Sequence, residues 1–315
     1  MQKIKVSLIG YGYWGSKLAR NFQNSKNFDL VAIIDNDKKK LQLAKRNFKY
    51  IECLHNINSI LKNENIDLVI ISTPTSTHYK LAHSLLNNSK NILVEKPLSL
   101  SIKQVKNLEK ISKLKKKKIF VDYPFLFAGS VNYIKNIISK NKFGPIVEIE
   151  SFREQAPIRR DANVLWDLGT HDVSILNYWL KKLPNKIRSI KTSNLKLPKY
   201  DSIYINLIYN KKINVIIKNS WISPTKVRLI KIKFKNAIVY CDENESLYKI
   251  KIYKKNYKNN WTSYKLEVPN LDHSEPLSKL TEYIYNSLKH NTNKLFENNF
   301  NVKVTTLLER IEKSS

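Results

Sequence analysis

The first 122 residues alternate short apolar runs with segments in which apolar positions recur at helical spacing. The apolar runs predict strands at residues 5–9, 30–34, 67–72, 92–95 and 118–122. The segments between them predict helices at residues 16–23, 38–48, 78–86 and 101–112. Such alternation is typical of a parallel sheet covered by helices. The pattern therefore predicts an α/β domain with a doubly wound parallel sheet over residues 1–122.

After residue 122 the pattern changes to a second α/β domain, expected over residues 123–315. Helices are expected at about 131–139 and 166–180, with a strand at 146–152. Further β-rich runs follow at residues 203–209, 213–221, 228–234, 237–241 and 247–253. Short runs joined by turns indicate a large, mostly antiparallel open sheet. The chain then returns to helix, and we expect the helix at about 300–313 to pack back on the first domain.

A glycine turn follows the first predicted strand at once and precedes a helix. It reads Gly10-Tyr11-Gly12-Tyr13-Trp14-Gly15, and the chain contains only 6 glycines in all. Glycines at this spacing give a tight turn, let the backbone approach a pyrophosphate and let the helix pack on the strand. The turn predicts a dinucleotide-binding Rossmann domain, with Tyr13 and Trp14 beside the cofactor.

An acidic residue, Asp35, closes the second predicted strand 20 residues after Gly15. A carboxylate at this place accepts hydrogen bonds from the adenosine ribose hydroxyls and repels a 2′-phosphate. The sequence therefore favours NAD(H) over NADP(H) as the cofactor.

Three more motifs stand at the ends of predicted elements. Residues 72–78 read Ser-Thr-Pro-Thr-Ser-Thr-His, residues 95–97 read Glu-Lys-Pro, and residues 167–171 read Asp-Leu-Gly-Thr-His. With the glycine turn and the C-terminal residues 275–277 and 305–315, they resemble the family of glucose-fructose oxidoreductase, inositol dehydrogenase and the MocA proteins.

That resemblance covers nearly the whole chain. It implies an N-terminal Rossmann domain and a C-terminal domain whose open sheet forms the interface of a homodimer or homotetramer. It also implies hydride exchange between a nicotinamide and a sugar carbon that carries a hydroxyl or ketone.

Oxidation of a secondary alcohol needs a proton acceptor and a cationic donor that stabilises the developing alkoxide. His171 and Lys96 suit these roles, because histidine titrates near neutral pH and Lys96 ends a Rossmann strand where ligands of open sheets bind. Asp167 lies four residues before His171 on a predicted helix, so both share one face. Asp167 would orient the substrate hydroxyl or His171.

Further residues are assigned to cofactor binding, substrate contact or packing. In the resemblance, Thr73, Pro74, His78 and Glu95 belong to the cofactor site, although His78 also suits a structural role. Tyr123 is assigned to packing at the domain junction or to substrate contact. A metal site is not expected, because Cys53 and His55 have no further ligands near them in the sequence.

An arginine cluster bears on the substrate. The chain has only 8 arginines, yet Arg153, Arg159 and Arg160 fall within eight residues, between a strand and the Asp167 helix. Arginine binds phosphate and carboxylate in a planar fork. The cluster suggests a nucleotide sugar or uronic acid as substrate, and a surface salt-bridge cluster is the alternative interpretation.

The match to the family has departures that put the best-known substrates in doubt. Ser174 stands where many relatives have a second aspartate, and residues 123–127 and 161–166 differ from the common patterns. Residues 164–174 look more like members from surface-polysaccharide and nucleotide-sugar pathways.

The composition of the chain bears on which classes of binding partner to expect. The formal charge of +30 would suit nucleic acid, but lysine is spread over every segment and no nucleic-acid motif is present, so we expect neither a nucleic-acid nor a membrane partner. Two distant cysteines and the absence of a long apolar run indicate a cytoplasmic protein.

We therefore expect an NAD(H)-dependent dehydrogenase or ketoreductase acting on a sugar or nucleotide sugar. A non-catalytic NAD-sensing regulator and a dehydrogenase of free sugars or inositols are the alternatives.

Overall fold

The computed structural model describes residues 3–159, 161–195, 200–210, 212–258, 261–297 and 299–314. The chain divides into two compact units. The first contains residues up to Pro124 together with Glu275–Thr305, and the second contains Phe125–Ser274 together with Thr306–Ser315. Residues 275–305 thus group with the N-terminal unit rather than with the second one, and the division falls inside the last helix.

The first unit is built on a six-stranded parallel sheet in the order β3-β2-β1-β4-β5-β6. Its strands are β1 (Ile4–Ile9), β2 (Phe28–Ile34), β3 (Glu52–Leu54), β4 (Leu68–Ile71), β5 (Asn91–Glu95) and β6 (Ile119–Asp122). The predicted doubly wound sheet is confirmed. Strand order reverses between β1 and β4, and ligands of such sheets bind at the carboxyl ends of the strands beside this reversal.

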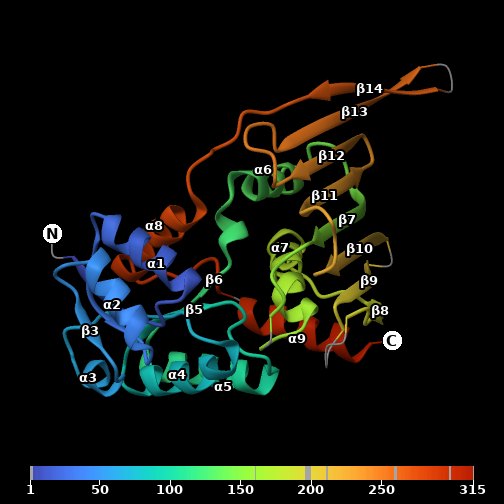
Figure 1. The fold of residues 1–315 in the computed structure, drawn as a ribbon. Coiled ribbons are helices and arrows are strands. Elements are labelled where there is room, and N and C mark those ends of the chain that lie inside the picture. The colour runs from blue at the N-terminus through green and yellow to red at the C-terminus, as the bar shows by residue number, and fades with distance from the viewer. Residues whose placement is uncertain are drawn as a thin grey trace. The chain divides into compact units, whose positions relative to one another are not determined.

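Helices cover both faces of this sheet. They are α1 (Tyr13–Asn24), α2 (Lys38–Asn47), α3 (Asn58–Leu61), α4 (Thr75–Asn87), α5 (Ile102–Lys115) and α8 (Pro276–Lys289). Helix α1 buries Leu18, Ala19 and Phe22, which lie on one face at helical spacing. Figure 1 shows α4 and α5 side by side under the sheet and α8 beside α1.

The second unit is built on an eight-stranded sheet in the order β14-β13-β12-β11-β7-β10-β9-β8. Its strands are β7 (Ile146–Glu154), β8 (Lys186–Thr192), β9 (Ser202–Tyr209), β10 (Ile213–Ser220), β11 (Val227–Phe234), β12 (Ala237–Asp242), β13 (Ile250–Lys258) and β14 (Trp261–Glu267). Strands β7 and β10 pair in parallel, and the other neighbours pair antiparallel. The prediction of a large, mostly antiparallel sheet is confirmed.

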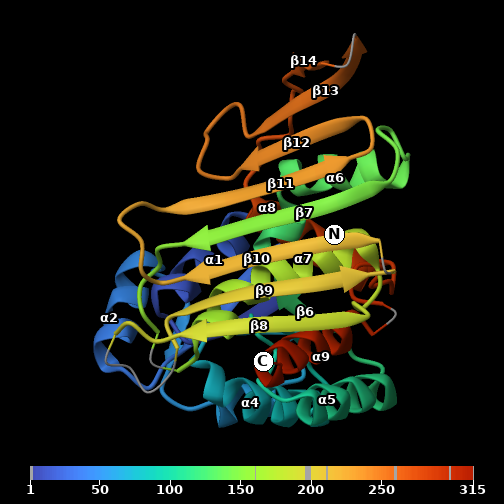
Figure 2. The same cartoon turned by 90° about the vertical axis from the view of Figure 1, so that its right-hand side faces the viewer.

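Helices lie on one face of this second sheet. Figure 2 shows α6 (Gly129–Ser139) and α7 (Thr170–Leu180) behind the strands, and none of the described helices in front of them. Burial alternates accordingly along the strands: in β7, Ile149, Ser151 and Arg153 are buried while Glu150 and Phe152 between them are partly exposed. The face turned away from the helices therefore carries partly exposed side chains.

The last helix, α9 (Phe300–Lys313), has contacts in both units. In the first unit, Phe300 packs 5.9 Å from Tyr123 between ring centroids, and Asn301 donates a hydrogen bond to Glu109 of α5. In the second, the carbonyl oxygen of Ile311 accepts a hydrogen bond from Ser189 of β8.

Several elements have no counterpart in the sequence predictions. They are α3, β3, β8 and β14. Strand β3 has three residues and β8 alternates lysine and arginine with small or apolar residues, so neither gives an apolar run. Among the described residues, no helix is long and apolar enough to cross a membrane.

Candidate active site

Backbone contacts build the turn between β1 and α1. Gly10 has φ +93°, and a Cβ there would lie 2.2 Å from the carbonyl oxygen of Ser72. A Cβ on Gly15 would lie 2.0 Å from the carbonyl oxygen of Gly10. At Gly12, by contrast, nothing lies within 4 Å of the Cβ position. Gly10 and Gly15 are therefore needed for packing, whereas Gly12 borders open space that a phosphate can approach.

The first turn of α1 completes this cradle. Gly12 is the N-cap residue, no side chain caps the helix, and the first turn has no acidic residue. The side chain of Tyr13 is 79% exposed, and the ammonium of Lys17 lies 4.2 Å from its ring centroid. Backbone N–H groups and a nearby cation at a helix N-terminus suit a pyrophosphate, so these residues fit a dinucleotide.

Asp35 ends β2 beside the turn. One carboxylate oxygen accepts a hydrogen bond from the backbone N–H of Tyr11 at 2.8 Å, and the other accepts one from Asp37 at 2.9 Å. The side chain is 5% exposed, and the ammonium of Lys40 lies 3.9 Å from it. The backbone thus fixes the carboxylate, and a weak ion pair accompanies it.

The ends of β4 and β5 meet through His78. Its ring nitrogens lie 2.8 Å from the carbonyl oxygen of Pro97 and 2.9 Å from that of Thr73. Pro74 is the N-cap residue of α4, and Lys96 is 6% exposed and joined to Pro97 by a cis peptide bond. His78 therefore ties together the two strand ends that carry Thr73, Pro74, Glu95 and Lys96.

The structure adds one residue to this cluster, Asp122 at the end of β6. It is fully buried and accepts a hydrogen bond from the indole N–H of Trp14. The pKa of Asp122 is raised to about 6, because burial raises it by more than the Trp14 hydrogen bond and the charge of Lys96 together lower it. The sequence signal was a single acidic residue at a strand end, which does not reveal its partners.

In the second unit, Asp167 and His171 lie on one continuous helical segment. Residues Leu165–Gly169 form a π-helical turn that runs directly into α7. Asp167 is 7% exposed and accepts a hydrogen bond from the indole of Trp221 at 3.0 Å. The ring of His171 packs edge-on against Phe125, with 5.0 Å between centroids.

Arg153, predicted to bind substrate, is buried against Asp172 in the structure. It is 1% exposed, and its Nε lies 3.0 Å from Oδ1 of Asp172. Ser151 and Asn219 also donate hydrogen bonds to Asp172, and the guanidinium lies 4.2 Å from the ring centroid of Phe125. Either charge buried alone would cost free energy, and the ion pair neutralises both. Arg153 therefore stabilises α7, the helix that carries His171, through Asp172.

Arg159 of the same cluster also contacts carboxylates. Arg159 makes two hydrogen bonds to Asp161, at 3.0 and 2.9 Å, and its Nη1 lies 3.7 Å from Oδ1 of Asp167. The side chain of Arg159 is 31% exposed. Arg160 lies outside the described residues. Of the two arginines of the cluster that the structure describes, Arg159 is the one that a ligand bound at Asp167 can contact.

Tyr123 is 1% exposed, and burial raises the pKa of its hydroxyl. Its ring stacks on Phe296, with 6.3 Å between centroids. Of its two expected roles the structure supports packing, because a buried ring in the first unit has no surface for a substrate.

Sequence reasoning missed Trp221 and Asn219, the residues at the end of β10 that hold Asp167 and Asp172. The only feature of the sequence that could have indicated them is the change from a mainly apolar strand to the polar and aromatic residues Lys218-Asn219-Ser220-Trp221. Which carboxylates they contact depends on how β10 packs on α7.

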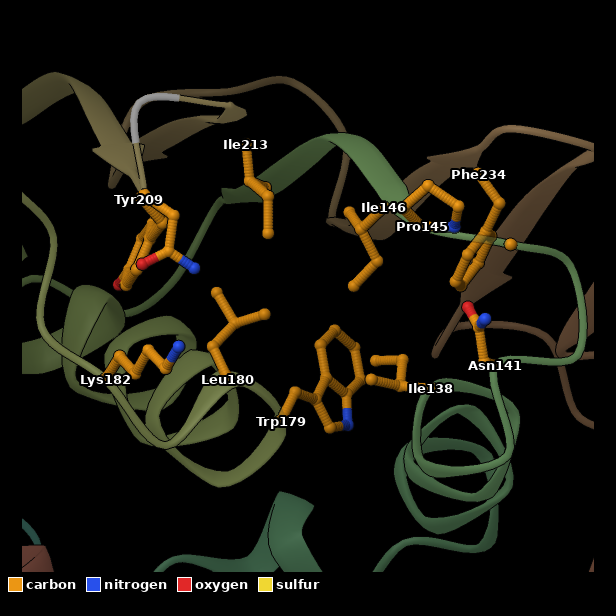
Figure 3. Close-up of a pocket in the computed structure, with 12 residues that line it drawn as sticks. Ile138, Asn141, Pro145, Ile146, Trp179, Leu180, Lys182, Tyr209, Ile213 and Phe234 are labelled. Atoms are coloured by element: carbon orange, nitrogen blue, oxygen red, sulfur yellow. The ribbon is translucent and has the colours of Figure 1, made fainter.

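A hollow of about 240 Å³ lies at the other end of α7 (Figure 3). Trp179 and Leu180 of α7 face Ile146 of β7 and Ile213 of β10 across it. No predicted site residue lines the hollow, so it is separate from the Asp167–His171 segment. Among the described residues, no three His, Cys, Asp or Glu side chains are grouped to hold a metal ion.

The glycine turn of the first unit and the Asp167–His171 segment of the second indicate the class of protein. The first unit is a Rossmann domain with a dinucleotide cradle, and the second is an α/β domain with an open sheet and an Asp–His pair on a helix. The family model described as the oxidoreductase family with an NAD-binding Rossmann fold matches residues 4–123. Residues 4–123 thus match the family of glucose-fructose oxidoreductase, inositol dehydrogenase and MocA, in agreement with the resemblance of the sequence motifs.

Two relatives illustrate the similarity. An uncharacterised oxidoreductase, YdgJ, of Escherichia coli is 25% identical over 53% of this chain and 51% of its own. The myo-inositol 2-dehydrogenase of Thermotoga maritima is 24% identical over 56% of this chain and 54% of its own. The chain thus spans about half the length of these relatives in the alignments.

Solved structures match over nearly the whole chain. UDP-N-acetylglucosamine 3-dehydrogenase GnnA from Acidithiobacillus ferrooxidans has a TM-score of 0.85 at 17% identity and covers 99% of this chain and 97% of its own. An oxidoreductase from Agrobacterium radiobacter in complex with NAD⁺, L-tartaric acid and magnesium has a TM-score of 0.86 at 16% identity, covering 99% and 96%. At these identities the likeness establishes the fold.

The glycine turn yields a prediction with a matched pair of variants. Gly12→Ala should keep the fold, because φ −84° suits alanine and the Cβ meets no atom, but should weaken NADH binding. Gly15→Ala should lower the free energy of unfolding by about 1–3 kcal/mol through overpacking. Urea unfolding and NADH fluorescence titration measure the two effects, and unchanged NADH affinity in Gly12→Ala would contradict the assignment of the turn.

Proposed function

We propose that the protein is a cytoplasmic NAD(H)-dependent oxidoreductase that transfers a hydride to or from a ring carbon of a sugar. The observation that carries this proposal is the Asp167–His171 segment. There a carboxylate held by Trp221 and approached by Arg159 shares one helix with a histidine. A protein that only senses a dinucleotide needs the glycine turn but no such proton-transfer pair.

The roles follow from the chemistry of alcohol oxidation. A bound nicotinamide would accept or supply the hydride. His171 takes the hydroxyl proton in oxidation and returns it in reduction. The ammonium of Lys96 stabilises negative charge on the substrate oxygen, and Asp167 orients the hydroxyl or the imidazole.

Within the sugars, we propose a nucleotide sugar of surface-polysaccharide biosynthesis. Arg159 supports this, because a partly exposed guanidinium beside Asp167 can bind a phosphate as well as its carboxylate partners. Relatives differ in substrate by name, from UDP-N-acetylglucosamine to myo-inositol, so free sugars and inositols form the competing class.

Activity is tested by following NADH absorbance with a panel of UDP- and dTDP-sugars, hexoses, hexose phosphates, inositols and their keto forms. At least one sugar should react. Lys96→Ala and His171→Ala should each lower kcat by about 10²–10⁴-fold while NADH still binds. Asp29→Asn, an exposed change on β2, is the control. Binding of NADH without turnover across the panel would favour the regulatory alternative instead.

Cofactor choice is a separate proposal, that NAD(H) binds more tightly than NADP(H). Asp35 supports it, because a fixed, nearly buried carboxylate repels a 2′-phosphate, although Lys40 at 3.9 Å offsets part of this repulsion. Competition titration should give tighter binding of NADH, and Asp35→Ser should reduce the preference. Tighter binding of NADPH to the wild type would refute the assignment.

We also propose that a second copy of the chain covers the open face of the eight-stranded sheet. Strands about 4.8 Å apart, with about eight residues at ~3.3 Å each, give a face of roughly 1,000 Å². A stable interface needs about 800 Å² per partner. Apolar side chains lie partly exposed there, among them Ile190 at 68% and Tyr204 at 44%. Ion pairs such as Lys231–Glu150 lie between them.

Sedimentation velocity tests this assembly. The wild type should sediment as a dimer or tetramer, and Tyr204→Glu should shift it toward monomer by placing a charge on the face. Tyr248→Glu is the matched control, because Tyr248 is 61% exposed in the connection between β12 and β13, outside both strands. A monomeric wild type at micromolar concentration would rule the proposal out.

A further inference from the structure

Asp122 is a buried carboxylate for which the proposed chemistry has no use. Its side chain is fully buried at the end of β6. Oδ2 accepts the hydrogen bond of the Trp14 indole, and Oδ1 has no hydrogen-bond partner among the described residues. Burying a carboxylate with one oxygen unpaired costs free energy, so a role beyond packing is needed to explain its presence.

Its neighbours connect both parts of the cofactor cradle. Trp14 belongs to the first turn of α1, where the backbone suits a pyrophosphate. Asp122 is paired with Glu95 in the parallel register of β5 and β6, and Lys96 follows Glu95 directly. A single carboxylate therefore joins the phosphate-binding turn to the strand end that carries the proposed catalytic lysine.

The charges around Asp122 favour interaction with Lys96. Burial raises the pKa of Asp122, and Trp14 from α1 and Lys96 after β5 lower it by less, so the net pKa is about 6. Glu95 of β5 and Glu109 of α5 raise the pKa of the adjacent Tyr123 hydroxyl. At neutral pH Asp122 is thus mostly ionised, and the charge acting on it is that of the Lys96 ammonium.

We propose that Asp122 is a positioning residue, which holds Trp14 in the first turn of α1 in the arrangement that binds the dinucleotide and places a carboxylate next to the strand end that carries Lys96. The role of Lys96 at the nicotinamide rests on the proposed function. Binding of the dinucleotide at the glycine turn rests on the geometry of that turn and on the family match of residues 4–123. Protonation of Asp122 removes the negative charge that accepts the Trp14 hydrogen bond, so the effect is present above pH 6 and is lost as the pH falls through about 6.

A structural role and a positioning role predict opposite effects on stability. The pKa of Asp122 is raised even with the attraction of Lys96 included, so its ionisation opposes folding at neutral pH. Asp122→Asn should therefore leave the Tm unchanged or raise it at pH 7.5. The same variant should weaken NADH binding by roughly 5- to 150-fold, the usual range of coupling between sites.

The experiment measures NADH affinity by fluorescence titration from pH 5 to 8.5, with Tm at each pH. Wild-type affinity should fall with a midpoint near 6, and Asp122→Asn should be weak and independent of pH in this range. Trp14→Phe should move the midpoint to higher pH, because the indole bond lowers the pKa of Asp122. Asp29→Asn, an exposed carboxylate change on β2, is the control and should match the wild type.

Two outcomes overturn the inference. One is wild-type affinity and pH profile in Asp122→Asn. The other is a lower Tm with affinity reduced equally at every pH, which indicates packing alone. NADH affinity and Tm are both measured without a sugar. Absence of turnover with every sugar would therefore refute the proposed function, whereas the NADH affinities would still decide this inference.

Discussion

Backbone-to-backbone contact at the glycine turn is the constraint on which the cofactor half of the molecule depends. Gly15 rests on the carbonyl of Gly10, and Gly10 rests on that of Ser72, at distances that exclude any side chain. This stacking brings the start of α1 against the ends of β1 and β4, where strand order reverses. The helix N-terminus, Asp35 and the His78 link between β4 and β5 can then surround one ligand.

The second unit depends on charge rather than on close backbone contact. Arg153 of β7 forms a buried ion pair with Asp172 of α7, and Ser151 and Asn219 donate hydrogen bonds to the same carboxylate. Asp172 is thereby committed to structure, which leaves Asp167 as the acidic partner of His171 on this segment. The buried pair also separates Arg153 from Arg159, which is partly exposed beside Asp167.

Local patterns predicted the two folds, the glycine turn and the helix that carries Asp167 and His171, because spacing along the chain determines them. Contacts between distant residues could not be predicted in this way. Trp221 bonds to Asp167 across 54 residues, and Trp14 bonds to Asp122 across 108. The burial of Arg153 and Tyr123 likewise depends on which strand and helix cover them. A single sequence contains no periodicity that reports such pairings.

The π-helical turn at Leu165–Gly169 has an evolutionary consequence. A π-turn holds one more residue than an α-turn and is frequent at functional sites. Loss of one residue there would restore an unbroken α-helix and rotate everything before it by about 100° relative to α7. Asp167 would then leave the indole of Trp221 while His171 kept its place against Phe125. The relative placement of the carboxylate and the imidazole thus depends on the one extra residue of this turn.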